Sequence, residues 1–343
     1  MFRLLRPLLF LLDAERAHRL TLAAVGMGMG KTARPDDPML STTVAGLTFP
    51  NPVGIAAGFD KNAEVPDDML RLGFGFAEVG TVTPEPQDGN PRPRIFRLRE
   101  DEAVINRLGF NNEGLEAVRA RLAVRHGLPG QVGVNVGANK DSADRIRDYA
   151  TGVRGMGRWA SYITVNISSP NTPGLRALQD RAELTRLVAA VIAARGPLPL
   201  PLFVKVAPDL QPEEVADIAE VITGSGIDAL IISNTTPSRD GLTSRNADEA
   251  GGLSGKPLLE RSTAMLRDFR RATGGKLPLI GVGGISSGAD AYAKIRAGAS
   301  LVQLYTGLVY KGPGLINDIK RDLVRLLRRD GFRRVSEAVG VDS

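Results

Sequence analysis

Short apolar runs rich in β-branched residues alternate with segments of helical periodicity along most of the chain. Each run is nearly continuous in apolar residues, which is typical of parallel strands buried on both faces. Eight such runs follow residue 44, at 53–57, 76–81, 132–136, 162–167, 202–206, 229–233, 279–282 and 301–305. The clearest helical segments between them are 112–125, 183–195, 213–223 and 258–273. Eight alternating units predict an α/β fold, a closed (β/α)8 or TIM barrel.

An open, doubly wound sheet would produce the same alternation of strands and helices. Polar residues and glycines follow nearly every predicted strand, however, and such a ring is typical of a barrel with its ligand site at the carboxyl ends of the strands. We therefore favour the barrel. A chain of 343 residues accommodates one barrel and a short extension, which we place at 41–343 and 1–40.

The extension follows a different pattern from the rest of the chain. Residues 1–12 are an apolar run interrupted by Arg3 and Arg6, too short and too charged to span a bilayer. Asp13 or a neighbour begins a second predicted helix at 14–25, and the glycine-rich stretch 26–30 ends it. Two short amphipathic helices of this kind form a lid or membrane-surface anchor, or they pack together to close the bottom of the barrel. The sequence favours neither arrangement.

Composition excludes several classes of chemistry. The chain has no cysteine, and its only histidines are His18 and His126. Disulfides, thiolate or histidine-rich metal sites, a cysteine nucleophile and a Ser-His-Asp triad are therefore not expected. The net charge of +6 favours an anionic ligand or an anionic membrane surface. Because the basic residues are scattered, nucleic acid is not expected as a partner.

The predicted strand ends carry amides, hydroxyls and lysines, and Asp60 is the exception among them. Without a carboxylate pair or metal ligands, this ring is poorly suited to hydrolysis. Amide side chains both donate and accept, so they match a planar ligand edged with N–H and C=O groups. The asparagines in question are Asn106, Asn135, Asn166, Asn171 and Asn234.

Two further features indicate an anionic cofactor. Glycines at 281–284 follow the seventh strand, and Tyr305 and Thr306 end the eighth. In barrels this pair of loops commonly holds a phosphate on backbone N–H groups, to which Gly255 could add another. Lys205 lies within an apolar strand, where a cation would stabilise the anion formed when a flavin is reduced. A core carboxylate partner is disfavoured, because no acidic residue lies nearby in sequence.

Six motifs at these positions, taken together and in this order, resemble those of dihydroorotate dehydrogenases of the quinone-dependent class 2. They are AAGFDK at 56–61, NRLGFNN at 106–112, NISSPNTPGLR at 166–176, KVAPDL at 205–210, SNTT at 233–236 and GVGGI at 281–285. The resemblance spans nearly the whole chain. It implies an enzyme with one FMN that oxidises dihydroorotate to orotate in pyrimidine biosynthesis and passes the electrons to a membrane quinone.

The resemblance also implies a role for each matching residue. FMN would be held by Ala57, Gly58, Lys61, Thr81, Asn135, Asn166, Lys205, Ser233, Gly255, Gly284, Tyr305 and Thr306. Dihydroorotate or orotate would be held by Lys61, Asn106, Arg107, Leu108, Gly109, Phe110, Asn166, Asn171, Asn234 and Thr235. Ser233 stands where relatives commonly have threonine, and it keeps the hydroxyl.

Ser169 would be the base that takes the C5 proton while hydride passes from C6 to flavin N5. A hydroxyl is too weakly basic to act unaided, so a water relay through Thr172 is a candidate aid. Ser168 is the alternative base. Class 1 relatives use cysteine here, which this chain lacks.

For the extension, the resemblance implies a helix pair that lies on the membrane and forms a quinone tunnel. His18 and Arg97 would line the quinone site, although a lone helix histidine is more often a surface residue. We expect a monomer attached peripherally to the cytoplasmic side of the cell inner membrane; a mitochondrial location stays open.

Rival hypotheses are another FMN barrel oxidoreductase, such as a soluble relative, and a non-catalytic flavin-binding module. The extension and the lack of cysteine disfavour the first, and the retained Ser169 and Lys61 disfavour the second.

Overall fold

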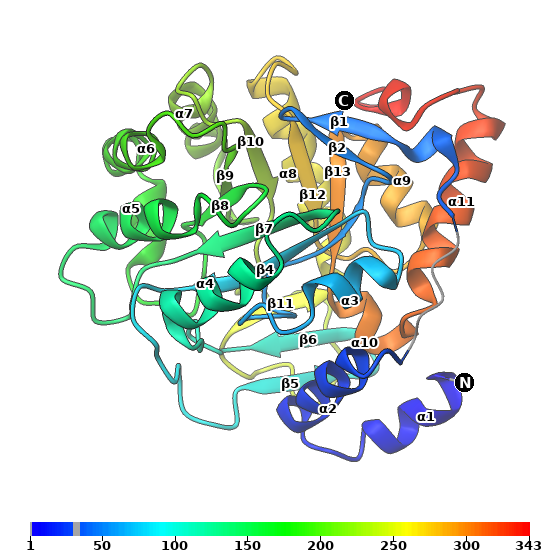
Figure 1. Ribbon diagram of the computed structural model, residues 1–343. Coiled ribbons are helices and arrows are strands. Elements are labelled where there is room, and N and C mark those ends of the chain that lie inside the picture. The colour runs from blue at the N-terminus through cyan, green and yellow to red at the C-terminus, as the bar shows by residue number, and fades with distance from the viewer. Residues whose placement is uncertain (1, 30–34) are drawn as a thin grey trace.

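The computed structural model describes residues 2–29 and 35–343. Eight parallel strands close into a barrel in the order β10-β12-β13-β3-β4-β7-β8-β9 (Figure 1). They are β3 (Val53–Ile55), β4 (Phe76–Val82), β7 (Gln131–Val136), β8 (Ile163–Asn166), β9 (Leu202–Val206), β10 (Ala229–Ile232), β12 (Leu279–Val282) and β13 (Ala299–Leu304). All eight predicted strands are confirmed. The barrel is closed because β13 pairs with β3, which an open sheet would leave apart.

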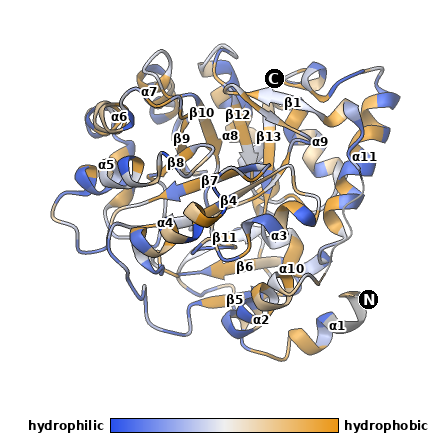
Figure 2. Ribbon diagram, viewed as in Figure 1, coloured by the Kyte–Doolittle hydropathy of each residue, from blue (hydrophilic) through white to orange (hydrophobic). Residues whose placement is uncertain are grey.

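Helices surround the barrel and turn their apolar faces inward, as the hydropathy colours of Figure 2 show. They are α3 (Pro66–Arg71), α4 (Gly114–Val124), α5 (Arg145–Met156), α6 (Arg181–Arg195), α7 (Pro212–Ile222), α8 (Leu259–Ala272), α9 (Gly288–Arg296), α10 (Thr306–Lys311) and α11 (Leu315–Arg329). Short 3-10 helices are η1 (Pro38–Leu40), η2 (Leu175–Gln179), η3 (Lys256–Leu258) and η4 (Val335–Ala338). The four helices predicted from periodicity are confirmed as α4, α6, α7 and α8.

A hairpin closes the amino-terminal end of the barrel. It consists of β1 (Thr42–Val44) and β2 (Leu47–Phe49), which pair antiparallel. The fully buried Phe49 ring lies 5.2 Å from that of Phe76, at the first position of β4. Tyr162 and Phe203 continue this aromatic layer, with stacked rings 4.5 Å apart. The alternative in which the extension helices close this end is therefore wrong, because the hairpin occupies it.

The opposite end carries a roof of two parts. Strands β5 (Ile95–Leu98), β6 (Ala103–Asn106) and β11 (Gly252–Gly255) form a three-stranded antiparallel sheet inserted after β4 and β10. Helices α1 (Phe2–Leu9) and α2 (Ala14–Gly26) lie beside β5 and α10 (Figure 1). As predicted, Asp13 caps α2, and its carboxylate accepts from the N–H groups of Glu15 and Arg16 at 3.0 Å each. No helix in the described ranges is long and apolar enough to cross a membrane.

Candidate active site

A cavity of about 1150 Å³ lies at the carboxyl ends of the barrel strands, between the barrel and its roof. Most residues predicted for the site line it. They are His18, Ala57, Gly58, Lys61, Thr81, Arg97, Asn106, Leu108, Gly109, Phe110, Asn166, Ser169, Asn171, Lys205, Ser233, Asn234, Thr235, Gly255, Gly284, Tyr305 and Thr306. The strand ends supply a polar floor, and α1 and α2 supply an apolar entrance.

Two predicted residues lie outside the cavity lining. Asn135 is fully buried one layer deeper, where its amide oxygen accepts from Thr81 Oγ1 at 2.6 Å. Arg107 turns away from the cavity and pairs with Glu249 at 2.6 Å, and its Cζ lies over the ring of Phe96, 4.4 Å from the ring centroid. The structure therefore places Asn135 as a support for Thr81, and it places the Arg107 guanidinium at the outer side of the roof.

The asparagines of the floor form one hydrogen-bonded network across the strand ends. The Asn166 amide donates to Thr81 Oγ1 at 3.1 Å, and its oxygen accepts from Asn234 Nδ2 at 3.2 Å. Asn234 Nδ2 also donates to Ser168 Oγ at 3.0 Å. These residues come from β4, β8 and the segment after β10, so the fold gathers amides that are far apart in sequence. Each amide is held in one orientation toward the cavity.

The two adjacent serines have different environments. Ser168 is fully buried and its hydroxyl belongs to the amide network, where it donates to Asn166 Oδ1 at 3.1 Å. Ser169 lines the cavity, and among the described residues its Oγ accepts a single hydrogen bond, from the N–H of Asn171 at 3.3 Å. Ser169 is thus free to meet a ligand, whereas Ser168 is already engaged. The structure describes both Ser169 and Thr172 and shows no hydrogen bond between their side chains, so the relay stays a prediction.

A carboxyl group that sequence reasoning missed lies under the floor. Glu78, in the middle of β4, is buried and accepts from Asn135 Nδ2 at 2.8 Å, Tyr162 OH at 3.1 Å and Gln303 Nε2 at 2.7 Å. Burial lowers the pKa of Lys205, and the charge of Glu78 acts in the opposite direction. Within the described ranges Lys205 forms no ion pair, as expected, but the closed barrel brings the charge of Glu78 close enough to act on it. The sequence signal that could have revealed Glu78 is a charged residue within an otherwise apolar strand.

Two lysines give the cavity a positive floor. Lys61 follows β3, and burial together with the charge of Arg94 lowers its pKa to about 8. Within the described ranges neither Lys61 nor Lys205 has an ion-pair partner within 4.0 Å. The neighbouring Asp60 is turned away and accepts from the N–H groups of Glu64 and Val65, at 2.8 Å each. The floor therefore attracts an anion.

A buried ion pair attaches the extension to the barrel. Glu15 on α2 accepts from Arg94 Nη2 at 2.6 Å and from its Nε at 3.0 Å, and only 5% of the Arg94 side chain is exposed. Arg97 on β5 donates to the main-chain oxygens of Leu9 and Leu12 and lies over the Phe10 ring, 4.8 Å from its centroid. Arg97 thus both lines the cavity and holds the turn between α1 and α2.

His18 packs inward, against the expectation for a lone helix histidine. Its ring lies 5.2 Å from that of Phe59 and 6.1 Å from that of Tyr305. Burial, followed by the charge of Lys61, lowers the pKa of His18 from 6.5 to about 4. The imidazole is therefore neutral at physiological pH, and this aromatic cluster joins the polar floor to the apolar entrance.

The low pKa of His18 predicts an acid-sensitive contribution to stability. Between pH 6.5 and about 4 the unfolded chain binds a proton at this histidine and the folded protein does not, so stability present above pH 6.5 falls as the pH falls. Allowing for partial exposure, the loss by pH 4.5 is about 2 kcal/mol relative to His18→Gln. Denaturant unfolding at pH 7 and pH 4.5 measures it. His126→Gln, at an exposed position, is the control; equal acid sensitivity in all three proteins would contradict the prediction.

Glycines shape the wall between β12, β13 and the start of α8. Gly284 has φ +81°, and a Cβ there would lie 2.4 Å from the Cα of Leu259. Gly255 has φ +101°, and its Cβ would lie 2.5 Å from the main-chain oxygen of Glu102. Thr306 is close by, with its hydroxyl 2.8 Å from that of Ser254. This wall presents main-chain atoms to the cavity, because there is no room for a side chain at Gly255 or Gly284.

A family model described as Dihydroorotate dehydrogenase matches residues 39–327. The chain belongs to the dihydroorotate dehydrogenase family. It is 62% identical to a dihydroorotate dehydrogenase (quinone) of Parvibaculum lavamentivorans, covering 100% of this chain and 99% of that protein. It is 59% identical to one of Novosphingobium aromaticivorans, covering 99% of both. The solved structure of ligand-free DHODH from Eimeria tenella aligns with a TM-score of 0.92 at 44% identity, over 96% of this chain and 99% of that chain.

These comparisons confirm the family resemblance that the six motifs indicated. The same barrel is present in a second Eimeria tenella dihydroorotate dehydrogenase structure, in complex with ferulenol, at a TM-score of 0.93 and 43% identity over 96% of both chains. Within this dihydroorotate dehydrogenase fold, sequence reasoning missed Glu78, the Glu15–Arg94 pair and the sheet of the roof. Arg94 lies in an arginine- and proline-rich loop that carries no signal of its own.

Proposed function

We propose that this chain is an FMN-dependent dihydroorotate dehydrogenase that oxidises (S)-dihydroorotate to orotate in pyrimidine biosynthesis and passes the electrons to a membrane quinone. One observation carries the proposal. A single cavity joins a floor of amides, lysines and Ser169 to an apolar entrance formed by α1 and α2. Two different reactants, one polar and anionic and one apolar, can thus reach a cofactor between them. All residues concerned come from one chain, so a monomer suffices.

The residues present fit FMN. The wall at Gly255 and Gly284 leaves room only for main-chain contact, as a phosphate requires. Lys205 supplies a buried cation for the pyrimidine edge of a flavin, and Thr81 and Asn166 offer oriented hydrogen-bonding groups beside it. We assign Ala57, Gly58, Lys61, Ser233, Tyr305 and Thr306 to the same cofactor, with Asn135 acting through Thr81. FMN bound by these residues would supply a hydride acceptor for the pyrimidine and an electron donor for the second acceptor.

Replacing Gly284 by alanine is expected to weaken FMN binding by tenfold or more, because Cβ would meet the main chain of Leu259 at a positive φ. The ratio of flavin to protein absorbance and an FMN titration of the apoprotein measure the effect. Gly241→Ala is the matched control, since Gly241 has φ +72° but nothing within 4 Å of its Cβ. Full FMN occupancy in Gly284→Ala at low FMN concentration would refute this placement of the phosphate.

The pyrimidine site is assigned to the groups nearest Ser169. Asn171 Nδ2 donates to Asn106 Oδ1 at 3.2 Å, so these amides are ordered before a ligand binds. With Lys61, Asn234 and Thr235, they match the carboxylate and the imide edge of dihydroorotate. Leu108, Gly109 and Phe110 complete the wall. Arg107 takes part only through its main chain, because its side chain points away.

Ser169 is positioned to take a proton from the pyrimidine. Only 6% of its surface is exposed, so water competes little for the hydroxyl. The N–H of Asn171, 3.3 Å from Oγ, stabilises negative charge that develops on this oxygen as its own proton leaves. A water leading outward past Thr172 would carry that proton away.

The extension is assigned to the quinone and the membrane. Among the described residues, six of nine exposed large apolar side chains lie in residues 2–29. They are Leu8, Leu11, Leu12, Leu20, Met27 and Met29. An apolar surface of this kind, with Arg16 and Arg19 beside it, suits an anionic membrane surface. We therefore propose peripheral attachment at the cytoplasmic side of the inner membrane, with His18 and Arg97 along the path of the quinone.

Anaerobic spectroscopy of the protein purified in mild detergent tests the proposal. Dihydroorotate is expected to bleach the flavin absorbance, and a short-chain quinone added next is expected to restore it. Bleaching without restoration would leave the pyrimidine chemistry standing and overturn the assignment of the extension. A protein that binds no FMN, or whose flavin does not respond to dihydroorotate, would overturn the proposed function.

A further inference from the structure

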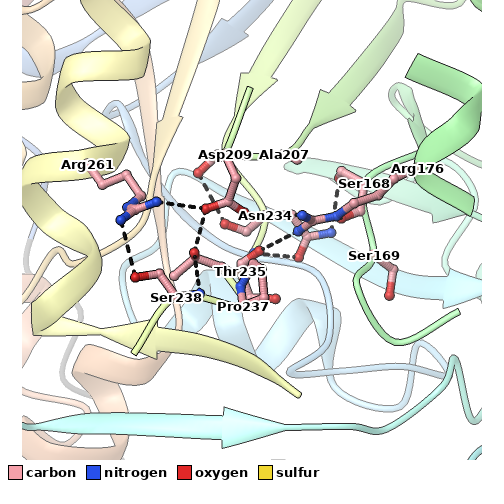
Figure 3. A network of polar contacts seen from close by, with 12 residues as sticks. Ser168, Ser169, Arg176, Ala207, Asp209, Asn234, Thr235, Pro237, Ser238 and Arg261 are labelled. Atoms are coloured by element: carbon pink, nitrogen blue, oxygen red, sulfur yellow. Dashed lines mark hydrogen bonds and ion pairs between the residues drawn. The ribbon is translucent and has the colours of Figure 1, made fainter. Parts of the chain in front are cut away.

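Arg176 joins three loops at the carboxyl end of the barrel without lining the cavity (Figure 3). It lies in η2, behind the loop that carries Ser169. Its Nε donates to the main-chain oxygen of Ser168 at 3.2 Å, and its Nη2 donates to that of Thr235 at 3.0 Å. Its Nη1 pairs with Asp209 Oδ2 at 3.2 Å. Both Arg176 and Asp209 belong to family motifs, and the proposed function has given neither a role.

Asp209 is itself fixed from the other side. Its Oδ1 accepts from Thr236 Oγ1 at 2.5 Å and from Arg261 Nη1 at 3.1 Å. Arg261 is anchored in turn by Asp240, whose Oδ2 lies 3.0 Å from Nη2. Figure 3 shows the contacts of Arg261 with Asp209 and of Arg176 with Ser168 and Thr235, and Ser169 takes no part in them. These contacts therefore connect the loops that follow β8, β9 and β10.

The guanidinium of Arg176 fixes the distance between the loop that contains Ser168 and the loop that contains Thr235. Ser168 precedes the proposed base, and Thr235 belongs to the proposed pyrimidine site. Because the donors of arginine have a fixed geometry, carbonyl groups bound at Nε and Nη2 cannot move independently. A lysine offers a single flexible ammonium and cannot reproduce this arrangement.

We propose that Arg176, held by Asp209, is a positioning residue for proton transfer, which sets Ser169 against the pyrimidine bound at Asn234 and Thr235. The inference rests on the proposed function. A displacement of about 1 Å between reacting groups slows a reaction by roughly 100-fold, so the loss of this support has a measurable effect. The effect is confined to the half-reaction with dihydroorotate, because Arg176 touches neither the glycine wall nor the extension.

Stopped-flow absorbance of the holoenzyme separates the two half-reactions. In Arg176→Met, flavin reduction at saturating dihydroorotate is expected to be about 100-fold slower than in the wild type. The rate of reoxidation by a short-chain quinone and the FMN content are expected to stay within about twofold of the wild-type values. Arg176→Lys is expected to remain slow. In Arg176→Ala, added guanidinium far below denaturing concentrations is expected to restore part of the reduction rate. Arg186→Met is the control, since that arginine is exposed and its one ion pair within the described ranges is with Glu183 on α6.

Asp209→Asn gives a second, milder variant in which Arg176 keeps both carbonyl acceptors. It is expected to slow flavin reduction by about tenfold and to leave reoxidation unchanged, whether or not Arg176→Met folds. Wild-type reduction rates in both variants would overturn the inference, and so would an equal loss of both half-reactions accompanied by loss of FMN. A wild-type enzyme whose flavin is not bleached by dihydroorotate would overturn the proposed function instead, so the two failures are distinguishable.

Discussion

Replacing Ser169 by alanine is expected to slow flavin reduction by dihydroorotate by about 1000-fold, which is within the range for loss of a general base. The reason is geometric: of the two adjacent serines, Ser169 is the one that lines the cavity, and within the described ranges its hydroxyl accepts one N–H, at 3.3 Å. Reoxidation of chemically reduced enzyme by quinone is expected to be unchanged, because Ser169 lies on the polar floor. Anaerobic stopped-flow absorbance measures both rates.

Ser168→Ala is the matched control for this experiment. Its hydroxyl is held by Asn166 and Asn234, so its removal is expected to affect stability and local order more than the chemical step. Flavin reduction is expected to fall by no more than about tenfold. If Ser168→Ala loses as much rate as Ser169→Ala, the assignment of the base to Ser169 is wrong.

Replacing Glu78 by alanine is expected to lower the free energy of unfolding by about 4 kcal/mol. The change leaves three buried donors, on Asn135, Tyr162 and Gln303, without their acceptor and removes the carboxyl group that acts on Lys205. It also opens a cavity in the barrel centre. Equilibrium denaturant unfolding at a fixed FMN concentration measures the loss, and FMN release is expected to begin at lower denaturant.

Two variants control for the effect of Glu78. Glu78→Gln keeps the volume and one acceptor oxygen, so it is expected to cost about half as much. Glu116→Ala removes a glutamate that is 70% exposed on α4 and is expected to change stability by no more than about 0.5 kcal/mol. A loss in Glu78→Ala as small as that in Glu116→Ala would show that the buried network is dispensable.

The barrel and much of its floor could be predicted from the sequence because both depend on local pattern. Strands buried on both faces are continuous in apolar residues, and their polar neighbours converge once the strands are parallel. Asn166 and Asn234 were therefore recognisable as members of one site. The sequence could not place the extension, because an amphipathic helix shows that one face is buried without showing what covers it. For His18 the helical pattern alone favoured a surface position, and only the family resemblance placed it at the proposed quinone site; its ring packs against Phe59.

Residues whose partners are distant in sequence were missed for a different reason. Glu78 is a single charged position in β4, and its partners lie on β7, before β8 and on β13. The sheet of the roof pairs β6 with β11, which come from separate insertions. Arg94 meets Glu15 across the join between extension and barrel. Each of these contacts depends on the closed fold, so no local sequence pattern predicts it.

The two ends of the cavity are built by different stretches of chain. The floor draws on strand ends from β3 to β13, whereas α1 and α2 shape much of the entrance. Under the proposed function, selection can act on the two separately, so we expect a change of electron carrier to be accommodated by substitutions in one short segment. For the same reason, we expect related enzymes to differ more at the entrance than at the floor, which makes the entrance the better place to seek inhibitors that discriminate between species.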